Sequence, residues 1–169
     1  YSYDFDTDTW VTHSNCPVPQ GGGYAVWFED NTILIFGHKH PDYYNYMYRY
    51  TISTDTWERL NDISISGWSS TGPVDGAYDS VNQIVYLHRY TSIFKYTISN
   101  GLFEVVTNSF GQYDTNYRMG LVYSSGYLFA PGAIYNSGAI GLNLSTNVIT
   151  NVTTSKAGLG LTTIYSVRK

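Results

Sequence analysis

An internal repeat of 46 to 47 residues is the feature that most constrains how this chain of 169 residues can fold. Each copy has a large apolar residue, six intervening residues and a second large apolar residue, and the copies start 47, 46 and 46 residues apart (50 − 3, 96 − 50 and 142 − 96). The pairs are Tyr3 and Trp10, Tyr50 and Trp57, Tyr96 and Phe103, and Leu142 and Ile149. So constant a spacing indicates that one supersecondary unit recurs along the chain.

The segment inside each pair is typical of a β-hairpin. Its middle falls on turn-forming residues, and the next position is held by residue types that tolerate a left-handed backbone. These residues are Asp8, Asp55, Gly101 and Asn147. We therefore predict that the two large residues of each pair lie roughly opposite each other across the hairpin, with a shift of one residue if the loop contains a bulge.

Two more runs of β-forming residues precede the hairpins. The run 31–38 matches 82–89 almost position by position, with a weaker copy at 126–132, and shorter runs come before each of them. The shorter runs are 24–28, 76–78 and 119–123. Most of these runs are too apolar for a strand with one wet face, so we expect burial on both faces. With four short strands per repeat and no helical period, the sequence predicts an all-β chain, a β-propeller built of four-stranded antiparallel blades.

The residues around the second repeat resemble the kelch repeat. An apolar run, 33–36, ends in Gly37 and is followed by Tyr50 and, seven residues later, Trp57. Kelch repeats have a Gly-Gly doublet at the end of that strand, and this chain has Gly37-His38 there instead. The resemblance covers essentially the whole chain with decreasing quality, and it implies a kelch-type β-propeller of degenerate repeats.

The repeat divides the chain into a single propeller region. We expect a partial blade at 1–20, blades at 21–66, 67–113 and 114–160, and a partial blade at 161–169. Because residue 1 is Tyr, we expect a processed chain or part of a larger one. Such an incomplete ring can belong to a larger ring, can be completed by further copies, or can close as a small four-bladed ring from the two terminal pieces.

The composition excludes several classes of function. Charged residues make up 13% of the chain and the formal net charge is −4, so the chain lacks the basic surface that nucleic acid requires. No apolar run reaches the roughly 18 residues of a membrane-spanning helix, so we expect no membrane insertion. Cys16 is the one cysteine, which rules out an internal disulfide. The low charge and the sequons at Asn143 and Asn151 favour glycosylation and a secreted, virion-surface or cell-surface protein.

The connections between second and third strands vary in length and share one rim of the predicted ring with the connections between blades. Variable loops on a rigid scaffold usually carry binding surfaces. Aromatic side chains with a polar tip suit protein interfaces and stacking on sugar rings. The candidate binding residues on this rim are His38, His40, Tyr43, Tyr44, Trp68, His88, Arg89, Tyr90, Tyr113 and Tyr135.

Metal and catalytic signatures are weak in this sequence. His38, His40 and Asp42 could share one ion on an extended segment, but no second set of ligands is evident, so we expect no metal and no cofactor. The carboxylates fall mostly in turns, and no nucleophile elbow, phosphate loop or HExxH motif is present.

We therefore expect a non-catalytic binding or structural module that contacts a protein partner, a glycan, further copies of itself or the remaining blades of its own ring. Two alternatives stay open. One is the propeller part of a secreted carbohydrate-active enzyme or of a galactose-oxidase-like enzyme, a class that resembles kelch propellers and holds copper beside a Cys–Tyr cross-link. The other is an intracellular kelch adaptor that recruits a protein.

Overall fold

The computed structural model of this chain describes residues 1–17, 23–29, 31–37, 45–66, 68, 74–110, 120–134 and 138–153. These residues form three four-stranded antiparallel sheets and one two-stranded hairpin. The hairpin pairs β1 (Ser2–Asp4) with β2 (Thr9–Val11). The first sheet contains β3 (Tyr24–Phe28), β4 (Thr32–Phe36), β5 (Met47–Thr51) and β6 (Thr56–Arg59). The second contains β7 (Asp75–Asp79), β8 (Ile84–Arg89), β9 (Ser92–Thr97) and β10 (Leu102–Thr107). The third contains β11 (Val122–Ser124), β12 (Tyr127–Ile134), β13 (Gly138–Asn143) and β14 (Val148–Thr153).

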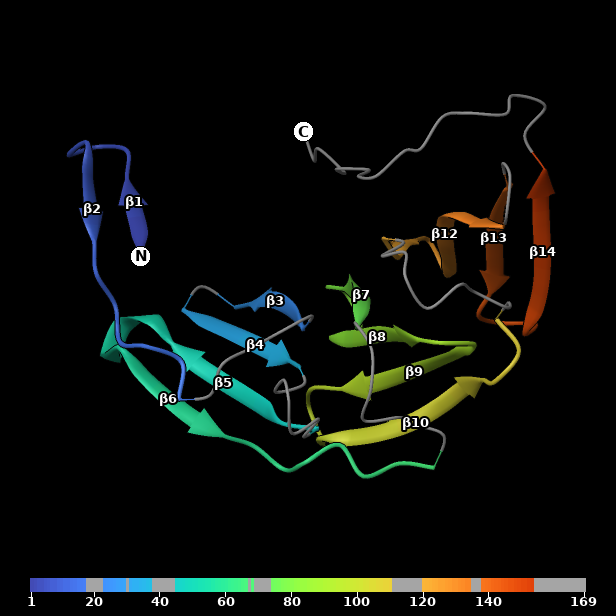
Figure 1. The fold of residues 1–169 in the computed structure, drawn as a ribbon, viewed down its shortest axis with the longest axis horizontal. Helices are drawn as coiled ribbons and strands as arrows, with labels where there is room; N and C mark the ends of the chain where they lie inside the picture. Colours follow the sequence, from blue (N-terminus) through green and yellow to red (C-terminus); the bar gives the residue numbers. More distant parts are fainter. Residues whose placement is uncertain are drawn as a thin grey trace.

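The sheets follow one another around an open arc (Figure 1). Strands are paired in chain order within each sheet, so every connection inside a sheet joins neighbouring antiparallel strands. The early strands β3 and β7 lie toward the inside of the arc, and the last strands β6, β10 and β14 lie on its outer side. The all-β fold predicted from the repeat is confirmed, and its sheets are arranged like blades. The one helical element among the described residues is a single 3-10 turn, Ile52–Thr54, in the β5–β6 loop.

All four repeated pairs lie directly opposite each other across their hairpins. Tyr3 faces Trp10, Tyr50 faces Trp57, Tyr96 faces Phe103 and Leu142 faces Ile149. The strand register places no one-residue shift at any of these pairs. The loop ends on a left-handed residue in every case, with φ of 55° at Asp8, 51° at Asp55, 69° at Gly101 and 58° at Asn147.

Buried side chains fill the two spaces between consecutive four-stranded sheets. Strand β8 contributes side chains to both spaces. Val85 and Leu87 belong to the cluster shared with the first sheet, and Tyr86 belongs to the cluster shared with the third. Successive residues of a strand point to opposite faces, so a central sheet needs apolar residues at every position. This explains why the middle of this strand, 84–87, is an unbroken apolar run.

Aromatic contacts connect the sheets. Phe36 of the first sheet packs edge-on against Tyr96 of the second, with ring centroids 5.4 Å apart. Tyr86 of the second sheet stacks on Tyr123 of the third, with centroids 5.6 Å apart. At the inner side, Gly76 of β7 lies beneath the ring of Tyr24 of β3, and a Cβ at position 76 would come within 2.5 Å of that ring. The sheets are thus in direct face-to-face contact.

The expectation of burial on both faces is wrong for β3. Val26 is buried, but Trp27 is 59% exposed and Ala25 is exposed, so the strand alternates between a buried and an open face. Val26 belongs to the cluster shared with the second sheet. The other face of β3 is open because the part of the chain that precedes it contributes only the hairpin β1–β2 among the described residues.

Candidate functional site

Six of the ten predicted binding residues lie outside the described residues: His38, His40, Tyr43, Tyr44, Tyr113 and Tyr135. The other four, Trp68, His88, Arg89 and Tyr90, belong to the end of β8 and the two connections beside it. The structure brings Trp68 and Arg89 together. The Arg89 guanidinium carbon lies 4.9 Å from the centroid of the Trp68 ring. The Trp68 indole donates a hydrogen bond of 2.9 Å to the Asn45 side-chain oxygen.

Arg89 is only 1% exposed and is therefore a buried cation. Burial lowers the pKa of Arg89 to about 10, because the surroundings of its guanidinium disfavour the charged form. The attraction between the cation and the electron-rich face of Trp68 offsets part of that penalty. This pair holds the rim end of β8 against the β6–β7 connection.

His88 is also buried, and its ring packs edge-on against Phe110 with centroids 5.5 Å apart. Burial lowers the pKa of His88 to about 4, so its imidazole is neutral near pH 7. Tyr90, in the tight β8–β9 turn, is 37% exposed. Of the four predicted binding residues that the structure describes, Tyr90 therefore presents a surface, whereas the other three pack inward.

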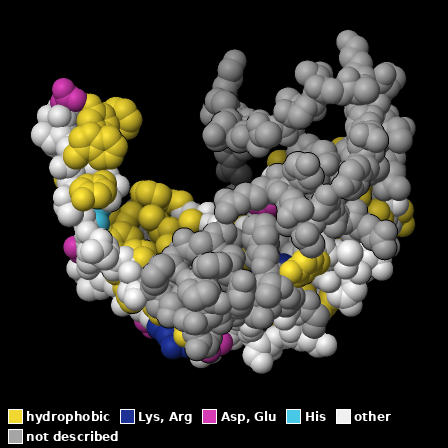
Figure 2. Space-filling view, in the orientation of Figure 1, with side chains coloured by type: hydrophobic (Ala, Val, Ile, Leu, Met, Phe, Trp, Pro, Cys, Tyr) yellow, Lys and Arg dark blue, Asp and Glu magenta, His cyan; other side chains and the backbone are white. Residues whose placement is uncertain are grey.

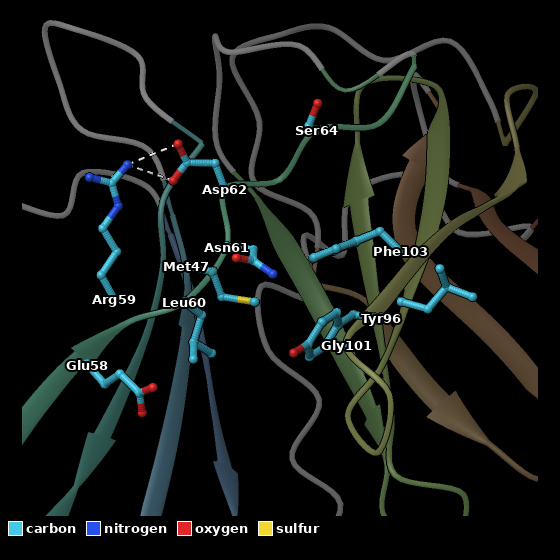
Figure 3. Close-up of a pocket in the computed structure, with 11 residues that line it drawn as sticks. Met47, Glu58, Arg59, Leu60, Asn61, Asp62, Ser64, Tyr96, Gly101 and Phe103 are labelled. Atoms are coloured by element: carbon cyan, nitrogen blue, oxygen red, sulfur yellow. Dashed lines mark hydrogen bonds and ion pairs between the residues drawn. The ribbon is translucent and has the colours of Figure 1, made fainter.

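A groove lies between the first and second sheets and is lined by described residues (Figure 3). Its volume is about 620 Å³, which lies in the range of small-ligand and peptide-side-chain sites. The lining residues come from β5, β6, the segment after β6, and the hairpin β9–β10. They are Met47, Glu58, Arg59, Leu60, Asn61, Asp62, Ser64, Tyr96, Gly101, Leu102 and Phe103. Met47 and Leu60 form part of one wall, and Tyr96 and Gly101 form part of the other.

The charged residues of the groove are paired with each other. Arg59 donates to both carboxylate oxygens of Asp62, at 2.8 and 2.9 Å. Arg49 reaches across the β5–β6 ladder to Glu58, with Nε 2.9 Å from its carboxylate oxygen. These pairs are exposed and contribute little to stability. In the groove, the acidic side chains of Glu58 and Asp62 are thus paired and lie among apolar lining residues such as Met47 and Leu60.

The preceding junction, between the first hairpin and the first four-stranded sheet, has a position that corresponds to this groove. There the chain itself fills the space. There the segment after β2 lies against hairpin β5–β6. The backbone N–H of Ser14 donates to the Asp55 carboxylate at 2.8 Å, and the Trp57 indole donates to the Ser14 carbonyl oxygen at 3.1 Å. The Tyr50 hydroxyl donates to the same Asp55 oxygen at 2.6 Å. Burial and this hydrogen bond raise the pKa of Tyr50 to about 12, and the hydrogen bonds from Tyr50 and Ser14 lower the pKa of Asp55.

The first hairpin carries an uncovered aromatic surface. Tyr3 packs against Phe5 and Trp10, with ring centroids 4.9 and 5.2 Å away, and Trp10 is 70% exposed. Figure 2 shows these hydrophobic side chains gathered on the hairpin at the upper left. In the next repeat, Trp57 is covered in part by the segment after β2. The exposed surface of the first hairpin thus corresponds to the face of hairpin β5–β6 that the segment after β2 covers.

The predicted glycosylation sites lie in hairpin β13–β14, Asn143 beside its turn and Asn151 within its second strand. The side-chain oxygen of Asn143 accepts hydrogen bonds from the backbone N–H groups of Ser145 (2.9 Å) and Thr146 (3.2 Å), and its amide nitrogen donates to the Tyr127 hydroxyl at 3.0 Å. Asn151 lies in β14, opposite Ile140. In the folded hairpin the Asn143 amide initiates the turn, as Asp4 does in the first hairpin.

Within the described ranges no group of three or more His, Cys, Asp or Glu side chains is placed to hold a metal ion. The same residues include no helix of the length and apolarity that a membrane span requires. Comparison with known protein families and with curated protein sequences finds no match for this chain.

The groove was missed in the sequence, although one signal for it was present. The left-handed turn position is Asp8, Asp55, Gly101 and Asn147 in the four repeats, and only Gly101 lacks a side chain. The other three repeats carry a hydrogen-bonding side chain at this position, so its absence at Gly101 leaves space in the groove.

Proposed function

We propose that this chain is a non-catalytic binding module on a β-propeller scaffold of kelch-like blades, and that it holds a protein partner or a glycan in the groove between its first two four-stranded sheets. The observation that carries this proposal is the groove itself. Apolar side chains of Met47, Leu60 and Phe103 in the lining, next to polar and paired charged groups, are the usual composition of a recognition site.

The scaffold supports this proposal because its sheets are rigid elements with short hairpin connections. Binding sites built on strands are held more accurately than sites on loops. The low charge of the chain, 13% of residues, favours neutral or weakly charged partners at an extracellular or virion surface. The propeller ring is then completed by further blades or by further copies of the chain.

Selection from a phage-displayed peptide library, together with a glycan array, tests the proposed function. The library is selected on the wild-type chain and then tested on Leu102→Glu, which places a carboxylate on a residue that lines the groove. Leu102 is half-exposed, so this change should not disturb folding. Val81→Glu is the matched control, because Val81 is exposed in the β7–β8 turn and does not line the groove.

We expect peptides or glycans that bind the wild type and Val81→Glu equally and bind Leu102→Glu at least 10-fold more weakly. Ligands that bind all three proteins equally would place the binding surface elsewhere. A chain that enriches no peptide and no glycan would contradict the binding function.

A further inference from the structure

The repeat makes it possible to compare the groove with the junction that precedes it. At that first junction, one carboxylate joins two segments: Asp55 accepts from the Tyr50 hydroxyl at 2.6 Å and from the backbone N–H of Ser14 at 2.8 Å. The Ser14 hydroxyl adds a further hydrogen bond of 3.0 Å to the same oxygen. At the first junction, the group that accepts these hydrogen bonds is thus a side chain of the chain itself.

Repeat-equivalent residues surround the groove at the second junction. Tyr96 corresponds to Tyr50 (50 + 46), Gly101 to Asp55 (55 + 46) and Asn61 to Ser14 (14 + 47). Gly101 keeps the left-handed backbone of Asp55, with φ of 69° against 51°. The second junction therefore retains the donor residue and the backbone geometry but has lost the carboxylate.

The lost carboxylate leaves the Tyr96 hydroxyl pointing at a vacant position. A Cβ at Gly101 would lie 3.9 Å from the Tyr96 hydroxyl oxygen, and outside the adjoining residues 100 and 102 no other atom lies within 4 Å of it. Within the described part of the chain, that hydroxyl has no hydrogen-bond partner such as Asp55 provides to Tyr50. Asn61, Tyr96 and Gly101 all line the groove, so the vacant position is part of its volume of about 620 Å³.

Both acidic side chains that line the groove are already paired. The nearby carboxylates of Asp62 and Glu58 are each engaged by an arginine, Arg59 and Arg49. An incoming carboxylate thus meets two neutralised ion pairs rather than unpaired acidic groups. Leu102 and Phe103 beside it supply apolar contact for the rest of the ligand.

From this comparison we infer that the groove binds an acidic peptide segment of a protein partner, whose aspartate or glutamate carboxylate accepts a hydrogen bond from the Tyr96 hydroxyl. The inference rests on the proposed function and names its ligand. A peptide is favoured over a glycan because the acceptor that this chain itself places at the equivalent position is an aspartate side chain, Asp55 on Tyr50 and Asp8 on Tyr3.

Nuclear magnetic resonance titration of the ¹⁵N-labelled chain with N-acetyl-aspartate N-methylamide tests the inference. N-acetyl-asparagine N-methylamide is the neutral control probe, and glucuronate is the anionic sugar probe. We expect shifts confined to residues around 96, 101 and 102, with the aspartate probe binding about 10-fold or more tightly than the asparagine probe, the factor typical of a hydrogen bond to a charged group. Tyr96→Phe should remove most of this difference.

Two reciprocal variants supply the second arm. Gly101→Asp places a carboxylate where Asp55 has one, so it should abolish binding of the aspartate probe and raise the melting temperature. Gly101→Asn is the matched control, because asparagine also tolerates a left-handed backbone but carries no charge. Asp55→Gly should lower the melting temperature by opening the first junction.

Equal affinity for the two amino-acid probes, or unchanged affinity in Tyr96→Phe or Gly101→Asp, would overturn the inference. Tighter binding of glucuronate than of the aspartate probe would also overturn it and assign the groove to an anionic sugar. Neutral library peptides that need Leu102 would leave the proposed function standing while this inference fails, and a library without any binder would refute the proposed function.

Discussion

At the scale of single residues, two different roles can be assigned to the Asn143 side chain. The sequence presents it as a glycosylation acceptor, and the structure shows its amide oxygen holding the first residues of the β13–β14 turn. Asp4 accepts the same bonds, from the backbone N–H groups of Asp6 and Thr7, in the first hairpin. A carboxylate or an amide oxygen can do this, whereas a methyl group cannot.

Asn143→Ala should therefore destabilise the protein by about 1 kcal/mol, because two backbone donors lose their acceptor. Asn143→Asp should lie within about 0.5 kcal/mol of the wild type, since Asp4 occupies the equivalent position. Urea denaturation of protein produced without glycosylation measures both values. Equal losses in the two variants would contradict the turn-initiating role.

His88 predicts a pH dependence of stability. Its pKa is lowered to about 4 in the folded protein by burial, from an ordinary value of 6.5, so the unfolded chain takes up the proton first as the pH falls. The contribution of His88 is fully present above pH 6.5 and is lost progressively toward pH 4, with an expected total of about 3 kcal/mol. The groups beside the ring are Phe110, the Tyr90 backbone and, across the β7–β8 ladder, Asp75.

Urea denaturation of the wild type and His88→Gln between pH 7 and pH 4 tests this dependence. The free energy of unfolding should fall more steeply in the wild type than in the variant. Asp55 does not confound the window, because its pKa is lowered by hydrogen bonding and its contribution is lost only below its ordinary value of 3.8. If the free energy of unfolding falls equally with pH in the wild type and in His88→Gln, His88 is not buried as a neutral group.

At the scale of strands and sheets, the closest approach between sheets is at Gly76. A Cβ there would lie 2.5 to 2.8 Å from three ring atoms of Tyr24, so alanine can be accommodated only if the first and second sheets move apart or the ring shifts. Gly120 is the matched control, because nothing lies within 4 Å of a Cβ at that position.

We expect Gly76→Ala to cost about 1–3 kcal/mol through overpacking. Gly120→Ala should be neutral or slightly stabilising, because it reduces the entropy of the unfolded chain. Adding Tyr24→Ala to Gly76→Ala should recover part of the loss. Denaturation of the wild type, Gly76→Ala, Tyr24→Ala and the double variant measures this recovery as a coupling energy. A neutral Gly76→Ala would contradict the close packing of β3 on β7.

The hairpins were predictable from the sequence because every determinant of a hairpin is local. The paired residues Tyr50 and Trp57 and the left-handed Asp55 lie within eight consecutive residues, and the same pattern returns in each repeat. The burial of Arg89 was not predictable, because it depends on Trp68, which lies 21 residues earlier in a connection without a repeating pattern. The groove was not predicted because a cavity is defined by residues from two sheets, although Gly101 marked its place.

At the scale of the whole molecule, the sheets form an open arc that ends in the hairpin β1–β2 (Figure 1). The aromatic surface of Phe5 and Trp10 on this hairpin is exposed, and exposed apolar patches of this kind mediate association. Copies of the chain should therefore associate through it. Sedimentation velocity should give a mass above 19.0 kDa that rises with protein concentration.

The double variant Phe5→Ser and Trp10→Ser should shift the chain toward monomer by removing the apolar surface. Val81→Ser is the control, because Val81 is equally exposed but lies in the β7–β8 turn. A wild type that stays at 19.0 kDa at every concentration would contradict self-association through the hairpin.

Face-to-face packing of consecutive four-stranded sheets is the claim on which the groove, the arc and the proposed function all depend. The most direct test is a nuclear Overhauser spectrum of protein with protonated Phe and Tyr rings in a deuterated background. Cross-peaks should connect the rings of Phe36 and Tyr96, whose centroids are 5.4 Å apart, and the rings of Tyr86 and Tyr123, at 5.6 Å. Assigned ring resonances without these cross-peaks would show that the sheets do not stack in this way.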